Sequence, residues 1–137
     1  MTLNAQILTR LKNKHLLVPG AFVDGRWIEY QPGQPGFDVT NPANGDVLAR
    51  LPDFGVADTQ AAIQAADAAQ KPWAALTGKE RSVYLKKLHA LMMVNVDDLA
   101  MILTAEMGKP LAEARGEIAY GASFVQWFAE EARRVYG

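Results

Sequence analysis

The sequence has 137 residues, half of them hydrophobic, and its 14 basic and 15 acidic residues leave a formal net charge of −1. This length fits one modest domain, and the balanced charge favours neither a nucleic-acid-binding nor a membrane-binding surface. The chain contains no cysteine, which excludes a disulfide framework, a thiolate metal site and a cysteine nucleophile within these residues.

The first segment predicts a short amphipathic helix that ends at Pro19-Gly20. The apolar residues on its buried side are Leu3, Ile7, Leu8 and Leu11. A targeting peptide is the alternative, because every charged side chain before Asp24 is basic. The helix is favoured, since this stretch has no serine and only one arginine.

Two β-hairpins are predicted next. Asp24-Gly25 separates the short apolar runs 21–23 and 26–28, and this dipeptide is typical of a tight hairpin turn. A loop rich in proline and glycine spans 31–36, and Asn44-Gly45 then provides a second turn between the runs 37–39 and 46–51. Two hairpins alone make a poor sheet, so these strands are expected to pack against more protein.

The remainder of the chain has helical periodicity. An alanine-rich helix is predicted over 57–70, with Pro72 as its stop. Thr77 and Glu80 form a capping-box pattern that opens a second helix, and a third begins near 95–98 and ends at Gly108. A long final helix is predicted from Leu111 to about Val135. The predicted fold class is α+β, with N-terminal β-hairpins followed by four helices.

No motif for catalysis is present. The two histidines, His15 and His89, lie far apart in the sequence, and Asp97-Asp98 fits a helix start better than a metal pair. A glycine-rich phosphate loop after a strand is also missing, so the chain shows no dinucleotide-binding fingerprint.

The final helix carries the most distinctive pattern. Tyr120, Phe124 and Trp127 lie at positions i, i+4 and i+7, so they share one face. Periodicity alone favours a face buried in a core, and the alternative is an aromatic wall of an apolar substrate channel. Gly116 and Gly121 weaken the same helix, and they either allow close approach of a neighbouring backbone or have no structural purpose.

Several motifs, in order along the chain, resemble the aldehyde dehydrogenase family. The run Phe22-Val23-Asp24-Gly25-Arg26-Trp27 is similar to that family's first strand pair, and Val39-Thr40-Asn41-Pro42-Ala43-Asn44-Gly45-Asp46 to its next hairpin. The helix 57–66 followed by Trp73, the run Lys79-Glu80-Arg81, and Glu106-Met107-Gly108-Lys109-Pro110 continue the match. The segments 108–118 and 122–131 resemble the succinate- and glutarate-semialdehyde dehydrogenase branch.

This resemblance implies an α/β parent enzyme with a Rossmann-like cofactor domain, a catalytic domain and an oligomerisation arm. In such an enzyme a cysteine thiolate attacks the aldehyde carbon, and NAD or NADP accepts the hydride. The family's catalytic cysteine, general-base glutamate, oxyanion asparagine and cofactor loop have no counterpart in these residues. The chain alone is therefore expected to be inactive and to bind no cofactor.

The resemblance also implies an organisation for the chain. Residues 1–20 are expected to form an N-terminal helix and linker, residues 21–52 a β-hairpin region, and residues 53–137 the helical part of a cofactor domain truncated before its motifs. The expected partner is the remainder of a cytoplasmic, homo-oligomeric subunit, with no nucleic acid or membrane involved. The alternative is a catalytically dead helical module that docks on a full-length subunit.

Five residues are expected to lie near functional positions by this resemblance. Tyr120, Phe124 and Trp127 would line or support the substrate entrance tunnel. The backbone carbonyls near Thr40 and Glu106 would contribute to a structural monovalent-cation site that some family members hold. No catalytic residue and no cofactor-binding residue is assigned.

Overall fold

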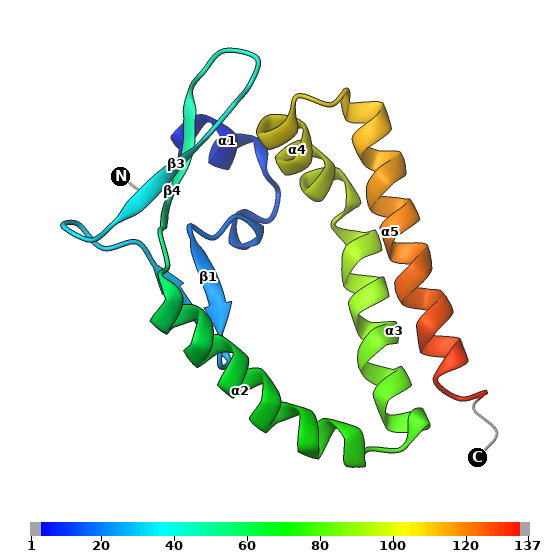
Figure 1. The fold of residues 1–137 in the computed structure, drawn as a ribbon. Helices are drawn as coiled ribbons and strands as arrows, with labels where there is room; N and C mark the ends of the chain where they lie inside the picture. Colours follow the sequence, from blue (N-terminus) through cyan, green and yellow to red (C-terminus); the bar gives the residue numbers. More distant parts are fainter. Residues whose placement is uncertain (1–3, 135–137) are drawn as a thin grey trace.

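The computed structural model describes residues 4–134, and it contains two β-hairpins followed by four helices, as the sequence predicts (Figure 1). A short helix and a 3-10 turn precede the hairpins. The elements in chain order are α1 (Ala5–Arg10), η1 (Lys14–Leu16), β1 (Gly20–Val23), β2 (Arg26–Glu29), β3 (Gly36–Thr40), β4 (Val47–Pro52), α2 (Val56–Ala75), α3 (Gly78–Val94), α4 (Val96–Met107) and α5 (Leu111–Glu131).

Both hairpins form around the predicted turns. Asp24 and Gly25 both have positive φ, 51° and 76°, which is the conformation of the turn that matches the twist of β1 and β2. Strands β3 and β4 are also antiparallel, with an irregular register between Val39 and Thr40. The two hairpins are separate two-stranded sheets, with β4 beside β1 and β2.

Helices α3 and α5 run side by side in opposite directions, and α4 joins them at one end (Figure 1). Helix α5 turns three fully buried alanines inward, Ala114, Ala122 and Ala129. Small side chains allow two helix backbones to approach closely, and the approach is tightest at Gly78. A Cβ added there would overlap the carbonyl oxygen of Ala132.

The N-terminal segment joins the hairpins to the helices. Ile7, Leu11 and Leu17 are buried together, and the half-buried Met101 and Ile102 of α4 pack against them. On the opposite side, Asn4 donates from its backbone amide to the carbonyl of Leu48 at 2.8 Å, and from its side-chain amide to the carbonyl of Val47 at 3.0 Å.

The buried carboxylate of Asp98 holds the bend between α1 and η1. It accepts hydrogen bonds from the backbone amides of Lys12 at 3.1 Å and Asn13 at 2.7 Å. The neighbouring Asp97 points to solvent and pairs with Arg115 at 2.8 Å. The prediction that Asp97-Asp98 marks a helix start is confirmed, and among the described residues no three His, Cys, Asp or Glu side chains gather as a metal site.

The predicted ends of the first and last helices are wrong. The first helix ends at Arg10 instead of Pro19, because Asp98 draws the next backbone amides away from the helix axis and Leu11 is already extended. The last helix ends at Glu131, where the amides of Arg133 and Arg134 donate to carbonyls three residues back. Leu3 and Val135, which the predicted helices include, lie outside the described residues.

Pro72 does not stop α2, which continues to Ala75. A proline removes one amide donor, and here that loss falls within the last turn of an exposed helix. A residue of α3 stabilises the end of α2, because Arg81 donates to the carbonyls of Ala74 at 3.3 Å and Leu76 at 2.5 Å. Trp73 also packs edge-on against Tyr84, with ring centroids 5.5 Å apart.

The capping box at the start of α3 is confirmed. The Glu80 carboxylate accepts from the Thr77 amide at 2.7 Å, and the Thr77 hydroxyl accepts from the Glu80 amide at 3.3 Å. These bonds to Thr77 lower the pKa of Glu80. Gly108 ends α4 in the left-handed conformation, with φ 77°, as predicted.

Within residues 4–134 no single helix is long and apolar enough to cross a membrane. Helices α3 and α4 reach that length and composition only together, and they are bent by 73° at their junction.

Asp98→Ala is expected to lower the free energy of unfolding by at least about 2 kcal/mol, because two partly buried backbone amides lose their acceptor. Asp97→Ala is the matched control, since it removes only an exposed ion pair and is expected to have a much smaller effect. Urea unfolding midpoints of the two variants measure the difference. Equal losses would show that Asp98 does not hold the N-terminal segment.

Candidate functional site

The aromatic residues of α5 form an exposed face. Tyr120, Phe124 and Trp127 are 65%, 48% and 58% exposed, and the adjacent Phe128 is 59% exposed. The rings of Tyr120 and Phe124 meet edge to face, with centroids 4.8 Å apart. The structure therefore brings the three predicted residues together, and it shows that they are not part of a core formed by the described residues.

This face lies opposite the buried alanines of α5, which packs against α3 and α4. Ala114, Ala122 and Ala129 fall on the other side of the helix from Tyr120 and Phe124, by the periodicity of 3.6 residues per turn. Helix α5 thus has one buried face with small alanine side chains and one solvent-exposed face with aromatic side chains. An open aromatic face of this kind marks a surface that contacts a ligand or more protein.

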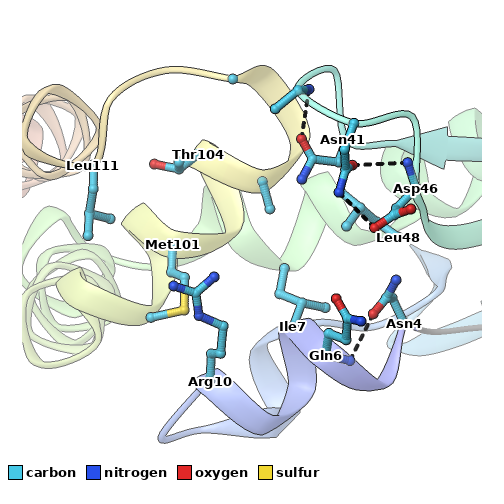
Figure 2. Close-up of a pocket in the computed structure, with 14 residues that line it drawn as sticks. Asn4, Gln6, Ile7, Arg10, Asn41, Asp46, Leu48, Met101, Thr104 and Leu111 are labelled. Carbon is cyan, nitrogen blue, oxygen red and sulfur yellow. Dashed lines mark hydrogen bonds between the residues drawn. The ribbon is translucent and has the colours of Figure 1, made fainter.

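The regions around Thr40 and Glu106 are also brought together. The turn that follows β3 rests against the end of α4, where a Cβ added to Gly108 would lie 3.0 Å from Cγ of Pro42. A groove of about 420 Å³ lies between this turn, α1 and α4 (Figure 2). Thr40 and Glu106 do not line the groove, but their neighbours Asn41 and Ala105 do.

The end of α4 has features that suit a cation. The last carbonyls of a helix lack intrahelical partners and carry the negative end of its dipole. The hydroxyl oxygen of Thr104, which also lines the groove, is buried and has no hydrogen-bond partner among the described residues. Desolvation raises the pKa of the Glu106 carboxyl next to this helix end, which disfavours its charged form in the absence of a cation.

The strand topology of residues 4–134 differs from that of a dinucleotide-binding fold. Dinucleotide-binding folds place the pyrophosphate between a parallel strand and the start of the following helix. The four strands of residues 4–134 pair only in antiparallel hairpins, so this part of the chain offers no such crossover.

Sequence reasoning missed two features of this region. Asp98 appeared only as a helix-start residue, because its contacts with Lys12 and Asn13 span more than eighty positions along the chain. The groove beside α1 was also not predicted, since α1, the 41–46 turn and α4 meet only in three dimensions. Lys12 and Asp97 also form an exposed ion pair between these segments, at 3.8 Å, and it too joins residues that are distant in the sequence.

Comparison with known proteins shows the family. The aldehyde dehydrogenase family profile matches residues 27–137, which is most of the chain, and the chain therefore belongs to the aldehyde dehydrogenase family.

The chain is similar to three bacterial enzymes along most of its length. It is 55% identical over 95% of its length to 3-sulfolactaldehyde dehydrogenase of Pseudomonas putida, and 52% identical over 93% to glutarate-semialdehyde dehydrogenase of P. putida KT2440. It is 50% identical over 93% to the NADP-dependent succinate-semialdehyde dehydrogenase of Escherichia coli K12. Each match covers 26% of the relative, so the chain spans about a quarter of the length of these curated relatives.

Solved structures match in the same way. An aldehyde dehydrogenase of Brucella melitensis biovar abortus 2308 superposes with a TM-score of 0.88 at 51% identity, over 92% of this chain and 26% of that one. Aldehyde dehydrogenase 21 of Physcomitrella patens, in complex with the reaction product succinate, superposes with a TM-score of 0.78 at 34% identity, over 88% of this chain and 25% of that one. The arrangement of hairpins and helices is therefore that of the matching part of an aldehyde dehydrogenase.

Proposed function

We propose that this chain is the N-terminal segment of a cytoplasmic, homo-oligomeric, NAD(P)-dependent semialdehyde dehydrogenase, which oxidises a semialdehyde to a dicarboxylic acid. The observation that supports this most directly is identity of 50–55% to enzymes named for sulfolactaldehyde, glutarate semialdehyde and succinate semialdehyde. Residues 1–20 serve as an N-terminal helix and linker, 21–52 as a hairpin region, and 53–137 as helical cover of the cofactor domain.

The chain contributes surfaces to this reaction and no reacting group. It has no cysteine, so the thiolate nucleophile comes from outside these residues. The cofactor is likewise bound outside them, where it supplies the hydride acceptor. Among the described residues, the open aromatic face of α5 is the part suited to an apolar substrate path.

A chimera tests the proposal. In it, this chain replaces the matching segment of the Escherichia coli succinate-semialdehyde dehydrogenase, to which it is 50% identical. The chimera is expected to oxidise succinate semialdehyde with NADP at a kcat/KM within about tenfold of the parent, a difference of about 1.4 kcal/mol in transition-state stabilisation. The isolated 137-residue chain is expected to show no turnover in the same assay.

A chimera that folds and binds NADP but does not turn over would contradict the proposal, and so would turnover by the isolated chain. The exposed aromatic residues also suit a module that docks on a full-length subunit. An isolated chain that is monodisperse in gel filtration and binds such a subunit would favour that second function.

Tyr120, Phe124 and Trp127 are proposed to line the substrate tunnel. In the full-length protein, meaning the longer enzyme proposed to carry this segment, Tyr120→Ala is expected to change KM for aldehydes of different length by about tenfold relative to one another. Cofactor affinity should stay the same if Tyr120 acts on the aldehyde, because the cofactor is proposed to bind outside this chain. Tyr120→Phe keeps the ring and is the conservative control. Equal changes for all aldehydes and for the cofactor would show that Tyr120 is only structural.

The carbonyls near Thr40 and Glu106 are proposed to hold a structural monovalent cation, with another ligand outside this chain. The full-length protein should then melt at a higher temperature in KCl or NaCl than in choline chloride at the same ionic strength, because an ion that binds only the folded state stabilises it. Gly108→Ala strains the left-handed end of α4 and should remove this difference. Identical melting temperatures in the three salts would count against the cation.

A further inference from the structure

The groove of about 420 Å³ between α1, the turn that joins β3 to β4, and α4 has a largely apolar lining (Figure 2). The apolar side chains are Ile7, Leu48, Met101, Ala105 and Leu111. Pockets that bind small molecules commonly measure about 300 to 1,000 Å³, and a few polar groups among apolar side chains fix the orientation of the ligand. This groove therefore has the size and the lining of a site for a small molecule with an aliphatic body.

Two charged side chains line the groove, and their charges are opposite. Figure 2 shows Arg10 of α1 and Asp46 of the turn on different sides of the groove, with Ile7 between them. Neither takes part in an ion pair among residues 4–134. The Asp46 carboxylate accepts a hydrogen bond from the side-chain amide of Asn44 at 2.7 Å, but this amide is neutral and does not balance the negative charge. The groove thus presents one positive and one negative group across an apolar surface.

The side of the groove that contains Asp46 is also close to the negative end of a helix. The 41–46 turn rests against the end of α4, where a Cβ added to Gly108 would lie 3.0 Å from Cγ of Pro42. The last carbonyls of a helix carry a partial negative charge. Glu106, the other acid near this helix end, does not line the groove. An ammonium group is therefore favoured on this side of the groove, and a carboxylate is disfavoured.

We propose that this groove binds a short ω-amino acid, with its carboxylate at Arg10, its ammonium group at Asp46 and its methylene chain against the apolar lining. Hydrogen bonds between charged groups of this kind are stronger than those between neutral groups. A dicarboxylate would place its second acid against Asp46, and an α-amino acid carries both charges on one carbon and cannot meet groups on different sides of the groove. The groove lies entirely within residues 4–134, so the inference does not depend on the proposed dehydrogenase activity.

Calorimetric titration of the full-length protein tests the proposal. The probes are 4-aminobutyrate and 5-aminopentanoate, and the controls are the aliphatic acid and the aliphatic amine of the same length. The better ω-amino acid is expected to bind about tenfold or more tightly than either control, because each control loses one charge-assisted contact. The salt is choline chloride, so that K⁺ or Na⁺ does not compete for the acidic side of the groove.

Substitutions of the two charged residues show where the ligand binds. Arg10→Gln and Asp46→Asn are each expected to weaken binding of the better ω-amino acid by about tenfold, and Lys12→Gln should have no effect. Lys12→Gln is the matched control for Arg10→Gln, because it removes the same charge two residues away, from a side chain that pairs with Asp97 and does not line the groove. Arg10 and Asp46 are exposed, and asparagine at position 46 keeps an acceptor for Asn44, so neither substitution is expected to unfold the protein.

Three results would overturn the proposal. The first is a wild-type protein that binds neither ω-amino acid. The second is binding that either Arg10→Gln or Asp46→Asn leaves unchanged, which would place the ligand elsewhere, such as the aldehyde site, since an ω-amino acid resembles a semialdehyde. The third is an aliphatic acid or amine that binds as tightly as the ω-amino acid.

Failure of this proposal is distinguishable from failure of the proposed function, because calorimetry needs no turnover. An active chimera that does not bind the ω-amino acids would reject the groove alone. A chimera that binds them and NADP but does not turn over would reject the dehydrogenase function alone.

Discussion

The carboxylate of Asp98 is the contact on which the arrangement of this segment depends. It is almost fully buried and accepts two backbone amides from the bend that follows α1. That bend directs Leu11 and Leu17 into a cluster of buried apolar side chains with Ile7. Asn4, at the other end of α1, then holds strand β4. The hairpins and the helices are thus joined through about fifteen residues at the start of the chain, and helix α2, which has no buried residue, adds little to that connection.

The balance between buried and open apolar surface explains why this fold is suited to being one part of a larger enzyme. The fully or nearly fully buried residues of α3 and α5 are small, namely Ser82, Ala114, Ala122 and Ala129, and they bury little apolar area per residue. The large apolar side chains point the other way, including Tyr120 and Phe124 on α5 and Tyr84 and Leu91 on α3. Hydrophobic burial within residues 4–134 is therefore modest, and the open faces gain their stabilisation only when a ligand or more protein covers them.

The sequence predicts those features of the fold that depend on interactions between adjacent residues. The Asp24-Gly25 turn, the Thr77–Glu80 capping box and the left-handed Gly108 each depend on a few adjacent residues, and each was predicted correctly. The errors lie where distant residues intervene. Arg81 and Tyr84 support the end of α2 beyond Pro72, and Asp98 ends the first helix from across the chain.

The aromatic face of α5 also has one feature that the sequence predicts and one that depends on distant residues. Spacing alone correctly placed Tyr120, Phe124 and Trp127 on one side of a helix. Spacing cannot separate a buried face from an open one, and on general grounds it favoured burial. The opposite face decides between the two, because Ala114, Ala122 and Ala129 are fully buried there and α5 packs against α3 and α4.

The similarity values bear on what this segment contributes to substrate choice. Identity is 55%, 52% and 50% to enzymes named for a sulfonated aldehyde, a five-carbon semialdehyde and a four-carbon semialdehyde. These values differ little although one of the three substrates ends in a sulfonate and the other two end in a carboxylate, so overall identity in this segment does not follow the acid group. The proposed substrate path along the aromatic face of α5 is compatible with that pattern, because a path that all three aldehydes share does not have to distinguish their acid groups. Under that proposal, recognition of the distal acid falls to residues outside this segment, and the aromatic face of α5 contributes only the shape of the approach.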